Sequence, residues 1–313
     1  MIGSQHLRRP AAEVTVVAKF KYAVSNWIYG GEDLELTYRR LHRAGFDGVE
    51  LVGEPDRHDP ERVLALNRQY GLKVTSVLSW CLWPIASRDL AHPDREMRRQ
   101  AVEYIARNVD LAVAVGAPIV VVIPGPAGRP APHGAGEDAP AWQRLAHEEW
   151  QLAVDSVRTA ADYARERGVL LAVEPINRFE SYLVNSAVHG VAFINAVGQD
   201  NVKLHLDTFH MHIEDPDIGE AIRLAGPLLV NMHLSDSNRQ AIGRGHFDFR
   251  GLLRALRTID YSGYLVLEPL PAHPNPFVGN RLEEHRARWD DDAADSIACL
   301  RGLERGLGWR PSG

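Results

Sequence analysis

The sequence predicts an α/β protein folded as a single (β/α)8 TIM barrel, and three observations support this prediction. Short apolar runs alternate with longer amphipathic segments along almost all of the 313 residues. Eight apolar runs can be separated, each of a length suited to a strand covered on both faces of a parallel sheet. Composition shifts nowhere in a way that would mark a domain boundary. Eight repeats favour closure of the sheet into a barrel over an open sheet.

The strands are expected where an apolar run is followed by polar or turn-forming residues. We expect one barrel domain over residues 18–313, including a C-terminal helix, and an N-terminal extension over residues 1–17. The eight expected strands cover residues 20–24, 48–52, 74–78, 119–123, 170–174, 202–207, 229–234 and 264–268.

Helices are expected between these strands, and several have recognisable ends. Asp59 followed by Pro60 is typical of an N-cap with proline at the first helical position. Apolar residues recur at helical spacing from Val102 to Val113, and Gly116 predicts the end of that helix.

Residues 124–141 break this rhythm, because they contain five prolines and four glycines. The next helix is therefore expected only over residues 143–167, before Gly168. In a barrel this stretch follows the fourth strand and lies at the C-terminal face, where substrates bind. It is interpreted either as a lid or as a disordered surface insertion.

Charge and composition favour a small-molecule ligand. The formal net charge of −6 argues against a nucleic-acid partner, whose phosphates call for a basic surface. The N-terminus lacks the apolar stretch of a signal peptide, and no apolar run approaches the roughly 20 residues that span a bilayer. The two cysteines form neither a disulfide framework nor a zinc pattern. We expect a cytoplasmic protein without a membrane partner.

The last four expected strands each end in a residue that can bind a metal ion. Strand side chains alternate between faces, and the neighbours that face the opposite way from these four residues are all apolar. The four should therefore point into the barrel at its C-terminal mouth. We refer to them as the mouth cluster: Glu174, Asp207, His233 and Glu268.

Three carboxylates in one place repel one another unless a cation compensates them. Together with one imidazole they form an oxygen-rich ligand set, which suits Mn²⁺, Mg²⁺ or Co²⁺ better than a structural zinc. We expect a divalent cation here, and the ligand set alone leaves the choice among these three metals open. The alternative is that each residue has its own local partner. His205 also faces the interior, beneath Asp207, and is interpreted as a core histidine with satisfied hydrogen bonds.

Several motifs stand in order between about residues 170 and 270, and together they resemble the ketose 3-epimerases of the D-tagatose/D-psicose 3-epimerase type. These enzymes belong to the xylose-isomerase-like sugar isomerase and epimerase superfamily. The spacings of 33, 26 and 35 residues within the mouth cluster are also similar to those of that family. The motifs are VEPINRFE from Val173, LDTFHM from Leu206, MH at Met232, NR at Asn238, GRGH from Gly243 and LEP from Leu267.

The resemblance implies that the mouth cluster binds one divalent metal and that Glu174 and Glu268 act as the catalytic acid–base pair on opposite sides of the substrate carbon. It also implies that Glu180, His210 and Arg239 bind the oxygens of the substrate. The implied reaction removes a proton next to the carbonyl of a keto-sugar through an enediolate, giving epimerisation or isomerisation. The alternative for Arg239 and Glu180 is a solvated surface pair.

The resemblance is weaker in the first half of the chain. Trp80 and Trp83 stand near the third strand, where the epimerases have small residues. Trp80 could stack on the aromatic aglycone of a larger ligand, or both indoles could be core. At the second strand, Glu50 or Glu54 could line the pocket.

These departures keep a lyase open as the alternative. The α-subunits of C-glycoside deglycosidases resemble this chain in barrel and metal site, act on 3-oxo-glycosides and work with a small β-subunit. Such a lyase needs a further acid or base, which His133 or His147 could supply. Inosose dehydration belongs to the same mechanistic group.

The sequence gives less support to functions other than sugar chemistry. Apurinic-site endonucleases share the barrel but bind several zinc ions through more histidines, and this chain is acidic. A non-catalytic metal-binding scaffold would bind metal without exchanging protons into sugars. The expected partner is a small sugar or glycoside, in a homo-oligomer or, for a deglycosidase, in a hetero-oligomer with the β-subunit.

Overall fold

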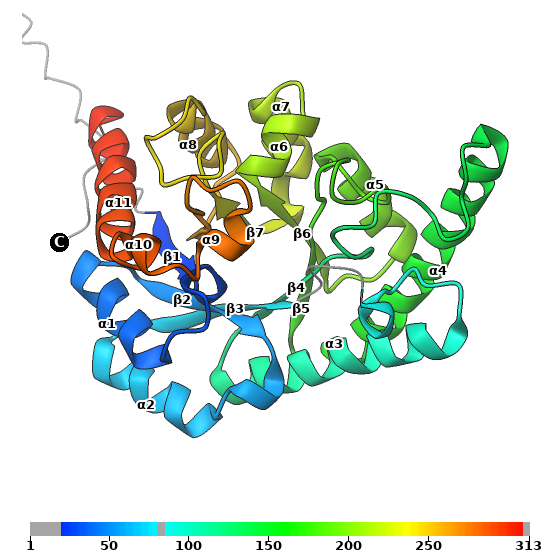
Figure 1. The fold of residues 1–313 in the computed structure, drawn as a ribbon, viewed down its shortest axis with the longest axis horizontal. Coiled ribbons are helices and arrows are strands. Elements are labelled where there is room, and N and C mark those ends of the chain that lie inside the picture. Colours follow the sequence, from blue (N-terminus) through cyan, green and yellow to red (C-terminus); the bar gives the residue numbers. More distant parts are fainter. Residues whose placement is uncertain (1–19, 80–84, 309–313) are drawn as a thin grey trace, which may run out of the picture.

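The computed structural model describes residues 20–79 and 85–308, and it confirms the (β/α)8 barrel (Figure 1). The expected extension over residues 1–17 and both Trp80 and Trp83 lie outside the described residues. All strand pairs are parallel, and β1 pairs with β8 to close the sheet. The strands are β1 (Lys21–Ser25), β2 (Gly48–Gly53), β3 (Lys73–Ser79), β4 (Ile119–Val122), β5 (Leu170–Val173), β6 (Val202–Asp207), β7 (Leu229–Leu234) and β8 (Tyr264–Leu267).

Helices surround the barrel, with α11 packed beside α1 on one side and α4 at the opposite edge (Figure 1). Within the described ranges, no helix is both long and apolar enough to cross a membrane. The longer helices are α1 (Leu34–Ala44), α2 (Pro60–Tyr70), α3 (Arg95–Val115), α4 (Ala139–Arg165), α5 (Ala187–Val197), α6 (Thr208–Glu214), α7 (Ile218–Ala225), α8 (Phe249–Thr258) and α11 (Trp289–Gly306), and the short ones are η1 (Asn26–Tyr29), η2 (Pro55–Arg57), η3 (Ala86–Arg88), η4 (Gly226–Leu228), α9 (Pro276–Gly279) and α10 (Glu283–Arg286).

The predicted helix signals are present where the sequence placed them. Asp59 caps α2 by accepting a hydrogen bond from the backbone N–H of Glu61, and Pro60 opens the helix. Gly116 ends α3 with a φ of 76°, a left-handed conformation that glycine adopts without steric cost.

The start of α4 differs from the prediction. The helix begins at Ala139 instead of residue 143, and it ends at Arg165. Pro140 therefore lies in the first turn, where a helix tolerates proline because the first N–H groups have no partner within the helix. The irregular stretch after β4 is correspondingly shorter than residues 124–141.

The interior of the barrel is shaped by two irregularities in strand register. The pairing of β2 with β3 shifts between Val49 and Glu50, and that of β6 with β7 shifts between Leu204 and His205. Such shifts re-aim the side chains that follow them. As a result, Asp207 stands opposite His233 in adjacent strands.

The alternation predicted for the last four strands is confirmed. The neighbours of the mouth cluster face the helical shell; seven are fully buried and Val230 is half-buried. Burial of these side chains against the helices fixes which residues can face the interior. The neighbours that face the shell are Leu171, Val173, Leu204, Leu206, Val230, Met232, Leu265 and Leu267.

Candidate active site

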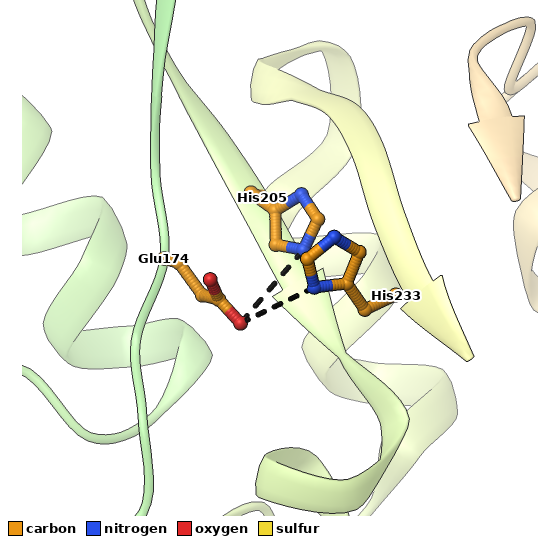
Figure 2. Close-up of side chains that lie close together, drawn as sticks. All are labelled: Glu174, His205 and His233. Carbon is orange, nitrogen blue, oxygen red and sulfur yellow. Dashed lines mark ion pairs between the residues drawn. The ribbon is translucent and has the colours of Figure 1, made fainter. Parts of the chain in front are cut away.

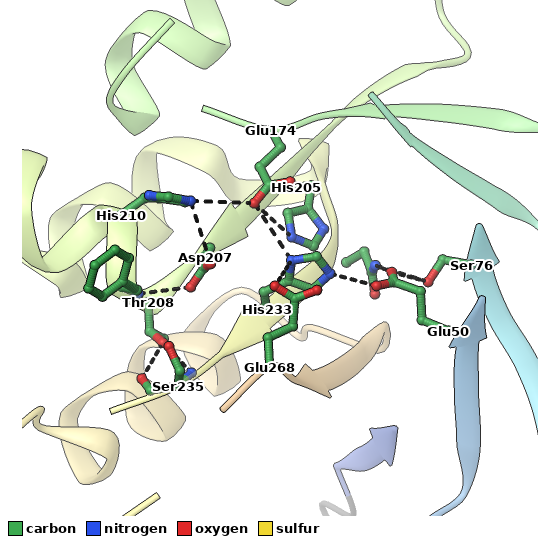
Figure 3. A network of polar contacts seen from close by, with 12 residues as sticks. Glu50, Ser76, Glu174, His205, Asp207, Thr208, His210, His233, Ser235 and Glu268 are labelled. Atoms are coloured by element: carbon green, nitrogen blue, oxygen red, sulfur yellow. Dashed lines mark hydrogen bonds and ion pairs between the residues drawn. The ribbon is translucent and has the colours of Figure 1, made fainter. Parts of the chain in front are cut away.

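The mouth cluster lies at the C-terminal end of the barrel, and each of its four residues is at most 3% exposed. His233 Nδ1 lies 3.6 Å from Glu174 Oε1 (Figure 2) and 3.2 Å from Glu268 Oε2. Asp207 connects to the group through His210, whose Nε2 lies 3.7 Å from Asp207 Oδ2 and 3.9 Å from Glu174 Oε1 (Figure 3). The four residues and His210 therefore form one connected group of contacts at the mouth of the barrel.

The other residues expected to bind substrate open onto the same space. One cavity is lined by Glu180, His210 and Arg239 together with three members of the mouth cluster. The guanidinium of Arg239 lies 3.6 Å from Asp207 Oδ2 and 3.5 Å from Glu268 Oε2. Its side chain is only 13% exposed, so the interpretation of Arg239 as a surface arginine is wrong.

Asn177, which the sequence analysis did not single out, holds two of these residues in position. Its side-chain amide donates to Glu180 Oε1 at 2.9 Å and to His210 Nδ1 at 2.8 Å. Acceptance at Nδ1 leaves the proton of a neutral His210 on Nε2, which faces Glu174 and Asp207. Asn177 thereby fixes both the orientation and the tautomer of His210.

Glu50 and Trp27 also orient the mouth cluster, Glu50 through His233 and Trp27 through Glu268. His233 Nε2 donates to Glu50 Oε1 at 2.8 Å, and the Ser76 hydroxyl donates to Glu50 Oε2 at 2.6 Å. The Trp27 indole N–H donates to Glu268 Oε1 at 2.5 Å. Of the two glutamates considered at the second strand, Glu50 thus belongs to the site.

Glu54 lies apart from this network. Its carboxylate accepts hydrogen bonds from the Arg88 guanidinium at 2.8 and 3.0 Å. The two side chains are about one fifth exposed. Glu54 is therefore a partner of η3 and not of the mouth cluster.

Protonation in the cluster reflects burial and crowding. Burial raises the pKa of Glu268 to about 8; His233 and Arg239 oppose this shift, while Glu50 and Asp207 add to it. Burial alone would lower the pKa of His233, but the Glu268 and Glu50 carboxylates outweigh it and raise that pKa well above the ordinary value. A proton thus compensates part of the negative charge, which is the task a divalent cation would perform.

His205 differs from its prediction as a satisfied core histidine. It is fully buried, and both ring nitrogens are without a hydrogen-bond partner among the described residues. Burial lowers the pKa of its imidazole well below the ordinary value. The ring lies beside Glu174 and His233 (Figure 2).

The donor atoms in the mouth fit a metal ion. Three groups of described side chains place potential ligand atoms within 4.8 Å of one another; each group contains two members of the mouth cluster, and all of the residues are buried. Asp207 Oδ2 and His233 Nδ1 are without hydrogen-bond partners among the described residues. Buried polar atoms of this kind are normally satisfied, and carboxylate oxygens with imidazole nitrogens are common ligands of divalent ions.

The loop after β7 positions Arg239 through one buried carboxylate. Asp236 accepts hydrogen bonds from the backbone N–H groups of Ser237, Gly243 and Phe247, at 2.7, 2.8 and 3.1 Å. Arg239 itself adopts a left-handed backbone conformation with a φ of 58°, and its carbonyl accepts from Leu270 N–H at 2.7 Å. The loop conformation therefore depends on contacts within the protein.

The proline- and glycine-rich loop after β4 packs over the cavity. Ala127 lines the cavity, and Gly128 N–H donates to the Glu180 carbonyl at 2.8 Å. Arg129 is mostly buried and pairs with Asp89 at 2.8 Å and Glu149 at 2.7 Å. These contacts favour the interpretation as a lid over that as a disordered insertion.

The two histidines considered as a further acid or base lie elsewhere. His133 Nδ1 lies 3.1 Å from Glu149 Oε1, in the ion-pair group that holds the lid. His147 lies on α4 in a separate surface pocket beside Trp150. Neither belongs to the described residues that line the cavity of the mouth cluster.

The chain is similar in sequence and in structure to known sugar epimerases. The family model described as xylose isomerase-like TIM barrel matches residues 38–303. The D-psicose 3-epimerase of Agrobacterium fabrum is 38% identical over 49% of this chain and 55% of its own length. The L-ribulose 3-epimerase of Mesorhizobium japonicum is 31% identical, with 88% of each chain covered. The crystal structure of 3-keto-D-glucoside 4-epimerase from E. coli superposes with a TM-score of 0.72 at 25% identity, covering 91% of this chain and 100% of that one.

Proposed function

This chain belongs to the xylose isomerase-like TIM barrel family, and we propose that it is a divalent-metal-dependent epimerase of keto-sugars. The observation that carries the proposal is that the buried mouth cluster gathers at one end of the barrel, where three of its members line one cavity. Relatives that match this chain are named D-psicose 3-epimerase and L-ribulose 3-epimerase, and the carboxylates, imidazoles and guanidinium that line the cavity suit a polar molecule. Removal of a proton next to the substrate carbonyl is the proposed chemical step.

In this proposal the mouth cluster holds one divalent ion, and Mn²⁺ is the metal that we expect. When bound, the ion polarises the substrate carbonyl and stabilises the negative charge that develops next to it. Oxygen-rich ligand sets favour Mn²⁺, Mg²⁺ and Co²⁺. The unsatisfied Asp207 Oδ2 and His233 Nδ1 support the assignment, because both are buried donor atoms without a partner among the described residues.

Glu174 and Glu268 are the proposed acid–base pair. One carboxylate removes the proton from one face of the carbon, and the other returns a proton to the opposite face, which inverts the stereocentre. Trp27 holds the Glu268 carboxylate in a fixed orientation through a 2.5 Å hydrogen bond.

Arg239, His210 and Glu180 are proposed to bind the oxygens of the sugar. Arg239 offers a buried guanidinium with fixed donors to the oxygen that gains negative charge. His210 presents Nε2 into the cavity, and Glu180 can accept from hydroxyl groups. The lid over residues 124–138 covers this space and limits the access of water.

A second candidate is epimerisation of a 3-keto-glycoside at the carbon next to its keto group. The similarity to 3-keto-D-glucoside 4-epimerase favours it, since the proton transfer is the same and only the substrate differs. Elimination of an aglycone, or dehydration of an inosose, would begin with the same step. Those eliminations need a further acid, and His133 and His147 are outside the residues that line the cavity.

The experiment incubates the Mn²⁺-loaded protein in deuterated water with ketoses and with 3-keto-glycosides. Deuterium at C3 of a ketose, together with its 3-epimer, would support the first candidate. Deuterium at C4 of an intact 3-keto-glycoside would support the second, and release of the aglycone would support a lyase. Metal binding without exchange into any of these compounds would overturn the proposal in favour of a metal-binding scaffold.

We also propose that the chain assembles as a homo-oligomer, as expected from the sequence resemblance. Light scattering of the purified chain would report a mass above that of the 34.8 kDa monomer. A stable monomer that is active on ketoses would contradict this part of the proposal.

A further inference from the structure

His205 lies in the centre of the barrel, two residues before Asp207 on β6. The register shift between Leu204 and His205 immediately precedes it and aligns this part of β6 with β7. Figure 2 shows its imidazole turned toward Glu174, next to the ring of His233. His205 therefore lies next to the proposed metal site, although the proposed function gives it no role.

The distances place His205 within reach of an ion that Glu174 and His233 share. His205 Nε2 lies 3.9 Å and His233 Nδ1 lies 3.6 Å from the same oxygen, Glu174 Oε1. Two ligand atoms with metal bonds of roughly 2.1 Å can be at most about 4.2 Å apart. The two rings are packed edge to face with centroids 4.0 Å apart, so both can direct a nitrogen to one point.

The hydrogen bonding of His205 agrees with a ligand role and not with a structural one. A buried structural histidine normally donates or accepts at one nitrogen at least, because an unsatisfied polar group is costly to bury. Both nitrogens of His205 are without a partner among the described residues, although the ring is fully buried. A metal bond at Nε2 would satisfy the nitrogen that faces Glu174.

We propose that His205 is a fifth protein ligand of the divalent ion, adding a second imidazole to the mouth cluster. The inference rests on the metal site of the proposed function and deepens it. Two nitrogen ligands favour Mn²⁺ and, more strongly, Co²⁺ over Mg²⁺, which prefers oxygen. The ion would then lie closer to the middle of the barrel than one held by the strand-end residues alone.

The test counts the imidazoles bound to Mn²⁺ by pulsed electron paramagnetic resonance, with and without ¹⁵N-labelled histidine. Two coordinated imidazoles are expected in the wild type and one in His205→Leu, whose side chain fills a similar volume. The ratio of Co²⁺ to Mg²⁺ affinity should fall by at least about tenfold in His205→Leu. His189→Leu, which removes an exposed imidazole on α5, is the matched control and should change neither quantity.

The outcomes separate this inference from the proposed function. One coordinated imidazole in the wild type, with proton exchange into sugars intact, would overturn the role of His205 alone. Two imidazoles in His205→Leu would overturn it as well. A wild-type protein that binds no divalent metal would overturn both proposals. If His205→Leu does not fold, the imidazole count of the wild type and the metal preference of His205→Asn decide the question.

Discussion

Glu50 and His233 share a 2.8 Å hydrogen bond on the floor of the candidate site. Glu50 comes from β2 and His233 from β7, so the contact crosses the inside of the barrel (Figure 3). With Nε2 bound to Glu50, His233 presents Nδ1 to Glu174 and Glu268. Carboxylates that accept from the second nitrogen of a metal-binding histidine fix its tautomer and ring orientation.

Glu50→Gln should therefore weaken binding of Mn²⁺ by roughly 10- to 100-fold, because the amide cannot support His233 with a negative charge. Competition calorimetry against a chelator of known affinity would measure the change. Glu54→Gln is the matched control, since Glu54 directly follows the same strand but pairs with Arg88. Equal affinities for wild type and Glu50→Gln would contradict the orienting role.

Glu174→Gln and Glu268→Gln should each lower solvent deuterium exchange into the substrate by at least about 10³-fold, because either change removes half of the acid–base pair. Mass spectrometry of the recovered sugar gives the rate. Metal content has to be measured in parallel, since both residues are also proposed ligands. Exchange that persists in either metal-loaded variant would show that the pair is wrongly assigned.

Metal affinity should rise from about pH 6 to about pH 8. The pKa of Glu268 is raised to about 8 and that of His233 is raised well above its ordinary value, so both groups hold protons in the metal-free protein at the lower pH. Those protons must leave when the ion binds, and higher pH removes them beforehand. Calorimetry in two buffers of different ionisation enthalpy would detect the released protons. Affinity independent of pH over this range would refute the prediction.

Trp27→Phe should lower kcat by about tenfold with little change in KM. The substitution keeps an aromatic ring but removes the indole N–H that donates to Glu268 Oε1. Steady-state kinetics on the substrate identified by deuterium exchange would separate the two parameters. Phe277→Leu provides the comparison, because it alters the stacking against Trp27 while leaving the hydrogen bond in place. A loss confined to KM would argue for a role in binding instead.

Arg129→Met should destabilise the protein by about 3 kcal/mol, because it leaves the buried carboxylates of Asp89 and Glu149 without their cation. Urea unfolding would measure the free energy. Arg144→Met is the control, since Arg144 and Glu148 form an exposed pair that should contribute less than about 1 kcal/mol. Equal stability of the two variants would mean that the lid is held by other contacts.

The series of apolar runs in the sequence predicted most of the barrel, because a strand that is covered on both faces consists of an uninterrupted apolar run. Every strand boundary lies within one residue of its prediction. The predicted start of α4 is wrong because the proline and glycine content of residues 124–141 argued against any helix there, whereas the first turn of a helix accepts Pro140. Helix termini depend on which N–H groups need a partner, and composition does not report this.

The candidate site was predicted where alternation reached a strand end, as at Glu174 and Asp207. Glu50 and His205 carry the same signal, since apolar residues flank each of them, but they lie one layer deeper. Alternation already places His205 in the interior, and applying it along the second strand would have placed Glu50 there as well. Trp27 and Asn177 had no such signal, because their positions depend on how the segments after β1 and β5 return over the mouth.

The carboxylate of Asp236 accepts hydrogen bonds from the backbone of the loop that carries Arg239, and these bonds hold the loop in its conformation without a bound sugar. The guanidinium is consequently preorganised, and the conformational entropy of this segment is lost during folding instead of during substrate association. Selectivity among sugars would then be altered by substitutions in the lid, while the anchored arginine remains common to every substrate that the barrel accepts.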